Sequence, residues 1–262
     1  MRSVQELDLS LALRADAVLS QVDLSSVKHV ADLGCATGTF AARLARAGPV
    51  VTAVDVSESN LAELRRLYGD LVTRGRLVPT RADLTALPIA TESIDLVFCL
   101  EVLEHVEDDR AAVREMARVL RPNGQLVLSV PNRDAPKPLV ERLGLSSVHD
   151  EAGPERHVRE GYSADELRHL LTEAGLRPIR IDGVGGSFFR LTSGLVSLGH
   201  LGYRRARGQS SWTWADVEQD SQSPVLRVYA RVFPALVSFV RLERAPTLAR
   251  AATLVVSAVR DG

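Results

Sequence analysis

The stretch VADLGCATGTF, residues 30–40, decides the expected fold. It is apolar and β-rich as far as Leu33, and it then supplies Gly34, Ala36 and Gly38 just before a segment with helical periodicity. Small residues at such a turn let the backbone approach a ligand closely. A dinucleotide-binding fingerprint needs glycines at relative positions one, three and six, and Ala36 and Thr39 occupy two of these. The spacing therefore disfavours a nicotinamide oxidoreductase.

Short β-rich runs alternate with helix-period segments along most of the chain, which predicts an α/β fold with a mainly parallel sheet and helices on both faces. Seven strands are expected, at residues 29–34, 49–55, 76–82, 93–100, 124–130, 177–184 and 253–259. Helices are expected at residues 40–47, 59–68, 109–120 and 164–174. Ser163 and Glu166 form a capping box for the last of them.

The domain organisation follows from this alternation. We expect an N-terminal helical segment at residues 1–26, a core at 27–184, a helical insertion at 185–246 and the final strand at 247–262. Most of the aromatic residues fall in the insertion, so it is interpreted as a cap with its own small core or as a lid over an acceptor pocket. A homodimer face or a membrane contact within it remains open.

Composition excludes several classes of partner. The formal net charge is -1, so no general basic field attracts nucleic acid, and none is expected as a partner. Cys35 and Cys99 lie inside apolar strand-like runs, which predicts reduced buried thiols and a cytoplasmic protein. No run approaches the roughly 18 uninterrupted apolar residues of a transmembrane helix, so no such segment is expected.

Acidic residues also follow the second and third expected strands. Asp55 lies about twenty residues beyond the turn, where a carboxylate can accept both hydroxyls of a ribose. Asp83 stands at the end of the third strand. With Asp32 and the turn, these residues resemble the class I S-adenosylmethionine-dependent methyltransferases, in particular the methyltransferase type 11 and ubiquinone-pathway O-methyltransferase group. Ala36 replaces the middle glycine of that family's first motif.

The resemblance implies a Rossmann-like seven-stranded methyltransferase sheet, with the helical insertion before its last strand, and a role for each motif residue toward S-adenosylmethionine. Asp32 and the turn would hold the methionine part, Asp55 the ribose, and Asp83 the adenine amino group. The complete cofactor-binding set is Asp32, Gly34, Ala36, Gly38, Asp55, Val56, Asp83 and Leu84. In it, Val56 offers an apolar face to the adenine and the Leu84 amide lies near the base.

A second constellation follows the fourth strand, where Glu101, Glu104 and His105 would share one face if a helical turn begins at Glu101. This E-x-x-E-H string, with His157 further on, resembles the divalent-metal site of small-RNA ribose methyltransferases and ubiquinone-pathway O-methyltransferases. The resemblance implies Mg or Mn held by Glu101, Glu104, His105 and His157. Such a cation would bind and acidify two oxygens of an acceptor diol.

Alternatives stay open on the acceptor side. In a metal-free enzyme His105 or His149 would take the proton, and His149 is also a rival fourth ligand. The acidic residues could simply favour a helix N-terminus, with His105 packed beneath the sheet edge. A noncatalytic partner protein that keeps the cofactor fold is the alternative from another class. We expect an O-methyltransferase for a small hydroxylated molecule, a sugar or catechol diol, with Glu104, His105 and His149 as candidate catalytic residues.

Overall fold

The computed structural model describes residues 9–136, 157–186, 224–241 and 247–262. Contacts divide the chain into two units. One comprises Ala15–Arg133, His157–Asp182 and Thr253–Gly262, and the other comprises Met1–Arg14, Asp134–Arg156 and Gly183–Ala252. The insertion expected at residues 185–246 falls in the second unit, and most of it lies outside the described residues.

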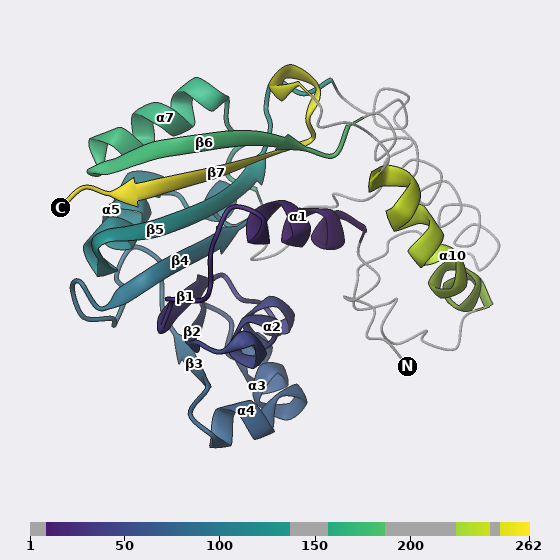
Figure 1. The fold of residues 1–262 in the computed structure, drawn as a ribbon, viewed down its shortest axis with the longest axis horizontal. Coiled ribbons are helices and arrows are strands. Elements are labelled where there is room, and N and C mark those ends of the chain that lie inside the picture. The colour runs from purple at the N-terminus through teal and green to yellow at the C-terminus, as the bar shows by residue number, and fades with distance from the viewer. Residues whose placement is uncertain (1–8, 137–156, 187–223, 242–246) are drawn as a thin grey trace. The chain divides into compact units, whose positions relative to one another are not determined.

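A seven-stranded sheet in the order β3-β2-β1-β4-β5-β7-β6 carries the site (Figure 1). Strands β1 to β5 pair in parallel, and β7 runs antiparallel to β5. This arrangement confirms the predicted Rossmann-like α/β sheet. The strands are β1 (His29–Leu33), β2 (Val50–Asp55), β3 (Leu77–Arg81), β4 (Ile94–Leu100), β5 (Leu120–Pro131), β6 (Leu176–Val184) and β7 (Thr253–Arg260).

The central strands are apolar because both of their faces are covered. From Val30 to Leu33 every residue of β1 is buried, and Leu96–Cys99 of β4 are also fully enclosed. Continuous rather than alternating apolar runs are typical of parallel strands covered on both sides. Phe40 from α2 meets Phe98 of β4 edge to face, with 5.1 Å between ring centroids. This contact joins the helix after the glycine turn to the middle of the sheet.

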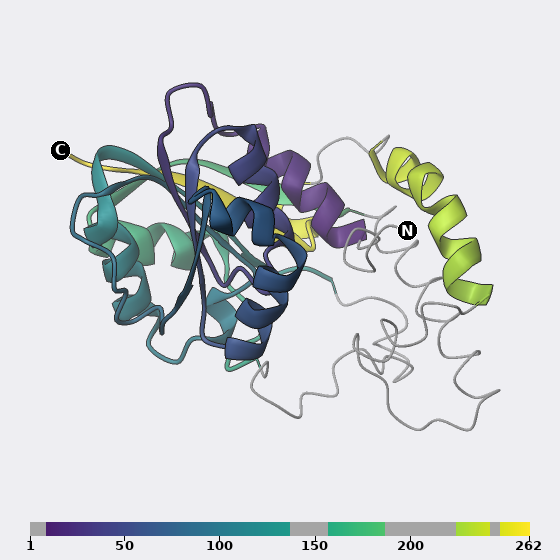
Figure 2. The ribbon, with the colours of Figure 1, turned by 90° about the horizontal axis from the view of Figure 1, so that it is seen from below.

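Helices cover both faces of the sheet, with α2 and α3 on one side and α5 and α7 on the other (Figure 2). Serine or aspartate side chains cap three of them: Ser57 for α3, Asp108 for α5 and Ser163 for α7. The predicted Ser163–Glu166 capping box is confirmed. The helices are α1 (Leu9–Leu19), α2 (Thr39–Ala47), α3 (Glu58–Leu67), α4 (Gly69–Thr73), α5 (Asp109–Val119) and α7 (Ala164–Glu173), with a short 3-10 helix, η2, at Leu103–His105.

The strand order reverses between β1 and β4, since the chain proceeds from β1 toward β3 on one side and from β4 toward β5 on the other. In open α/β sheets, ligands bind beyond the carboxyl ends of the strands at this reversal. All described residues of the two predicted constellations lie at or just after the carboxyl ends of β1 to β4, except His157, which lies between β5 and α7. The topology therefore gathers them at one edge of the sheet.

Strand β5 begins earlier than the sequence pattern predicts. The turn signal at residues 121–124 ends α5 at Val119 as expected, but the chain enters the sheet at Leu120. Ile94 pairs with Leu120 and Leu96 pairs with Gln125, so the extra residues bulge from the ladder, with Asn123 at a φ of 63°. The short helix α4 was not predicted either.

In the other unit, α10 (Pro224–Arg241) is the long helix of the described residues. Phe233, Val237 and Val240 are buried along it at the spacing of one helical face. A 3-10 helix, η3 (Leu248–Arg250), follows. Among the described residues, no helix combines the length and apolarity needed to cross a membrane.

Candidate functional site

The turn after β1 needs glycine at two positions, because a side chain at either one would collide with a neighbouring residue. Gly34 and Gly38 adopt φ angles of 74° and 82°, in the left-handed region that favours glycine. A Cβ added to Gly34 would lie 2.2 Å from a methyl of Val102, and one added to Gly38 would lie 2.5 Å from a methyl of Leu64. Ala36 also has a positive φ, 47°, and is exposed. Both glycines are thus required by close packing, whereas Ala36 carries only backbone strain.

Asp32 lies at the floor of this turn with a relative exposure of 3%. Its Oδ2 atom is buried and has no hydrogen-bond partner among the described residues. Burial, reinforced by the negative charge of Asp55, raises the pKa of Asp32 to about 7, while a hydrogen bond from the Ala41 amide opposes the shift. A positively charged group placed beside this carboxyl would favour its ionised form.

Asp55 ends β2 and braces the glycine turn. Its Oδ2 accepts from the Ala36 amide at 2.9 Å, and its Oδ1 accepts from the Ser57 amide at 2.8 Å and from Nδ2 of Asn60 at 3.3 Å. A carboxylate offers about four acceptor directions. Three are engaged by these donors, so Asp55 both positions the turn and retains limited capacity for a hydroxyl.

Asp83 follows β3 in a tight turn. Its Oδ1 accepts from the amide of Thr85 at 2.8 Å and from the Thr85 hydroxyl at 2.6 Å, and these hydrogen bonds lower the pKa of Asp83. Val56, which follows β2, is 61% exposed, whereas Leu84, which follows Asp83, is buried. An exposed valine and an oriented carboxylate after adjacent strands suit a flat base with an amino group.

The two cysteines are structural. Cys35 and Cys99 are free and buried, which confirms the prediction of reduced buried thiols. Burial raises the pKa of both thiols, and nearby carboxylates, including Asp32, reinforce the shift. Neither is suited to act as a nucleophile, since thiolate formation controls cysteine reactivity.

On the acceptor side, Glu101 lies outside the helical turn that the sequence suggested. The 3-10 helix η2 begins at Leu103, and Glu101 precedes it with a φ of 56°. Its amide donates to the carbonyl of Ser129 at 2.9 Å, and the Ser129 hydroxyl donates to Oε1 of Glu101 at 3.1 Å. Because β4–β5 pairing holds Glu101 in this way, the expected i, i+3, i+4 alignment from Glu101 does not form.

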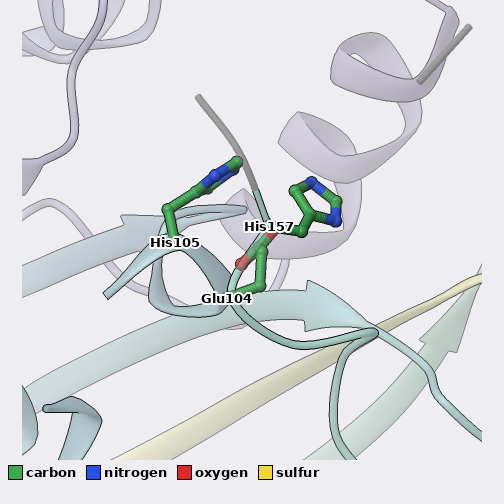
Figure 3. Close-up of side chains that lie close together, drawn as sticks. All are labelled: Glu104, His105 and His157. Atoms are coloured by element: carbon green, nitrogen blue, oxygen red, sulfur yellow. The ribbon is translucent and has the colours of Figure 1, made fainter. Parts of the chain in front are cut away.

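Three of the four predicted metal ligands do come together. Glu104, His105 and His157 each offer a ligand atom within 4.8 Å of the others (Figure 3). Glu104 is 1% exposed, and the rings of His105 and His157 meet edge to face with centroids 4.6 Å apart. Nδ1 of His105 is buried and has no hydrogen-bond partner among the described residues. Glu101 is not in this group, and His149 lies outside the described residues.

His157 reaches the group because residues 157–163 are fastened to η2 and to the end of β5. The amide of Val158 donates to the carbonyl of Glu104 at 3.0 Å, and the amide of Tyr162 donates to the carbonyl of Pro131 at 3.0 Å. Gly161 has a φ of 124°, and a Cβ there would lie 2.3 Å from the Pro131 carbonyl oxygen. The segment therefore follows the sheet edge closely enough to bring a distant histidine beside η2.

Sequence reasoning missed a polar network next to this group. Arg159, Asp109 and Tyr162 bond to one another: Oδ2 of Asp109 accepts from Arg159 at 2.5 Å and from the Tyr162 hydroxyl at 2.9 Å, and Arg159 also donates to that hydroxyl. Tyr162 is buried, and this burial raises the pKa of its phenol. An arginine two residues after the candidate ligand His157 was the available signal.

Comparison with known proteins agrees with the geometry. A family model described as a methyltransferase domain matches residues 31–128. O-methyltransferase resE of Aspergillus sclerotiorum is 32% identical over 63% of this chain and 61% of its own length. A ubiquinone biosynthesis O-methyltransferase of Xanthomonas oryzae is 40% identical over 46% of this chain and 50% of its own. Residues 31–128 belong to the methyltransferase domain family, and they resemble the class I S-adenosylmethionine-dependent enzymes. It spans at most 61% of the length of these relatives.

Solved structures show the same fold at low sequence identity. An S-adenosylmethionine-dependent methyltransferase from Mesorhizobium loti has a TM-score of 0.58 at 18% identity, covering 97% of this chain and 100% of that one. The [4+2]-cyclase SpnF has a TM-score of 0.59 at 19% identity, covering 95% and 80%. Since one of these proteins is a cyclase, the fold of this chain does not by itself define its reaction.

Proposed function

We propose that this chain is an S-adenosylmethionine-dependent O-methyltransferase for a hydroxyl of a small molecule, assisted by a divalent cation. The observation that carries the proposal is the grouping of Glu104, His105 and His157. They lie at the same edge of the sheet as the glycine turn. The relatives named as O-methyltransferases support transfer to oxygen.

The donor side is proposed to bind the cofactor through the ends of β1, β2 and β3. Asp32, buried beside the turn, would respond to the positive charge of the methionine part of the cofactor. Asp55 has three acceptor directions in use, so one ribose hydroxyl would bond to it directly. Asp83 would accept from the adenine amino group, with Val56 against the base and the Leu84 amide near it.

The donor set on the acceptor side fits a divalent cation. Nδ1 of His105 is a buried ring nitrogen without a hydrogen-bond partner in the described residues, and a carboxylate and a second imidazole lie within ligand distance. Two imidazoles and one carboxylate suit a transition-metal cation better than Mg, which prefers oxygen ligands, and Mn is the member of that series closest to Mg in its ligand preference. Bound there, the cation would supply Lewis-acid polarisation that lowers the pKa of an acceptor hydroxyl.

The residues themselves would orient the acceptor. Three protein ligands leave room for two adjacent oxygens, which favours a sugar or catechol diol as the acceptor class. The sulfonium methyl is already electrophilic, so alignment of the hydroxyl, the methyl carbon and the sulfur supplies most of the rate enhancement. In a metal-free version of the same reaction, His105 is positioned to take the proton through its unpartnered Nδ1.

Calorimetric titration with S-adenosylmethionine tests the donor side. Binding is expected in the purified chain and is expected to weaken in Asp55→Asn, which keeps the shape of the side chain but loses its charge. If the wild-type chain bound no S-adenosylmethionine, the enzyme proposal would be wrong, and a noncatalytic role for the fold would replace it.

A matched pair of variants tests the acceptor side. Glu104→Gln is expected to abolish binding of manganese measured by calorimetry, whereas Glu101→Gln is expected to retain it, because only Glu104 joins the histidine pair. Methylation of a panel of vicinal diols should fall with chelator in parallel. Activity that persists unchanged with chelator and in Glu104→Gln would leave the metal-free reaction with His105 as base.

A further inference from the structure

The Arg159–Asp109–Tyr162 network is attached to both parts of the candidate cation site. From Arg159, Nη1 reaches the carbonyl of Leu103 at 3.4 Å and Nη2 reaches the carbonyl of Glu107 at 3.0 Å. These two carbonyls bracket Glu104 and His105 in the sequence. The same arginine lies two residues after His157, so one side chain connects the two segments that supply the ligands.

The network is sheltered enough for its hydrogen bonds to fix geometry. The side chains of Arg159 and Asp109 are 24% and 22% exposed, and Tyr162 as a residue is 5% exposed. Tyr162 also directs its hydroxyl toward the carbonyl of Leu103 at 3.4 Å, and the Arg159 guanidinium carbon lies 5.5 Å from the centre of its ring. Charged hydrogen bonds out of bulk water are stronger and more directional than exposed ones.

Backbone contacts and the Arg159 side chain both fasten residues 157–163. Tyr162 pairs with the end of β5, since its amide donates to Pro131 and its carbonyl accepts from the Arg133 amide at 3.1 Å. Nearer to His157, the Val158 amide donates to the Glu104 carbonyl. The guanidinium adds hydrogen bonds to the carbonyls of Leu103 and Glu107, and so restrains the segment next to His157 against η2.

We propose that Arg159, oriented by Asp109 and Tyr162, is a positioning residue that holds His157 against Glu104 and His105. The inference rests on the proposed function, in that the three ligands are taken to bind a cation. Partners behind metal ligands fix ligand orientation, and their loss costs about 10- to 100-fold in metal affinity. The network assigns that role to residues outside the proposed ligand set.

The experiment uses Arg159→Gln with Arg133→Gln as the matched control. The Arg133 side chain pairs with Glu166 at 2.8 Å, both side chains being half-exposed, and Glu166 belongs to α7 rather than to η2. The first readout is the nuclear Overhauser effect between the His105 and His157 ring protons in histidine-labelled protein without metal. The second is the affinity for cobalt(II), followed by its visible absorption, with S-adenosylmethionine affinity as a check on the fold.

Arg159→Gln is expected to lose the ring-to-ring effect and to bind cobalt(II) at least tenfold more weakly, while Arg133→Gln matches wild type within about twofold. Arg159→Lys, which keeps the charge beside Asp109 but cannot span both carbonyls, is expected to recover part of the loss. Tyr162→Phe retains the ring and provides a second variant if Arg159→Gln does not fold. The inference is overturned if the ring contact and cobalt(II) affinity survive in these variants as in Arg133→Gln. If wild type binds no cobalt(II) but Arg159→Gln still loses the ring contact, the proposed cation site is wrong and the positioning role of Arg159 stands.

Discussion

Substituting Gly34 by alanine tests how closely β1 and the turn after β4 approach. The new Cβ would lie 2.2 and 2.7 Å from the two methyl carbons of Val102 and 3.0 Å from its Cβ. A non-glycine residue in the left-handed region costs about 1–2 kcal/mol, and overpacking of this kind costs about 1–3 kcal/mol. We therefore expect Gly34→Ala to lower the free energy of unfolding by about 2–5 kcal/mol, measured by urea denaturation.

Two further variants separate the two costs of Gly34→Ala, which are backbone strain and steric overlap with Val102. Gly75→Ala has a similar backbone, with a φ of 65°, and no atom within 4 Å of the added Cβ, so it should cost only the about 1–2 kcal/mol of the left-handed conformation. In a Val102→Ala background, Gly34→Ala should fall to the same range, which gives a coupling energy of about 1–3 kcal/mol. A Gly34→Ala variant no less stable than Gly75→Ala, or one that Val102→Ala does not rescue, would refute the reasoning.

The other expectations concern the same turn. Ala36→Gly should raise the free energy of unfolding by up to about 1 kcal/mol, because relief of the strain at a φ of 47° exceeds the entropy that glycine adds to the unfolded chain; a lower urea midpoint would contradict this. The pKa of Asp32 is raised from 3.8 to about 7, so its contribution to stability is fully present below pH 3.8 and is lost as the pH rises through 7. That loss is about 4 kcal/mol for the cofactor-free protein. Asp32→Asn should flatten this part of the stability profile between pH 4 and 8, and an unchanged slope in unfolding experiments would argue against it.

Periodicity predicted the sheet well because its strands are buried on both faces and lie between clear turn signals. His29–Leu33 and Thr253–Arg260 both fall within a residue of the expected ranges. The start of β5 was wrong because entry at Leu120 depends on pairing with Ile94 across the sheet, which the turn-like residues 121–124 conceal. Tertiary pairing here overrides local turn preference.

Some residues of the candidate site could likewise be predicted from sequence, and others could not. The glycine turn, Asp55 and Asp83 could be placed from sequence because each lies at or just after a strand end. Glu101 could not, since its position depends on a hydrogen bond from Ser129 and a positive φ rather than on helical spacing. The role of Arg159 was equally hidden, because its partners lie about fifty residues earlier and become neighbours only when residues 157–163 follow the sheet edge.

The reversal of strand order between β1 and β4 separates the two halves of the chemistry along the chain. Residues proposed to hold the methyl donor end at Leu84, and those proposed to receive the acceptor begin after β4. Apart from Val102, which packs against Gly34, substitutions or exchanged segments after residue 100 lie outside the strands proposed to carry the donor. A lineage built on this sheet can diversify its products while its methyl source stays constant, and segment exchange between relatives is the laboratory counterpart of that freedom.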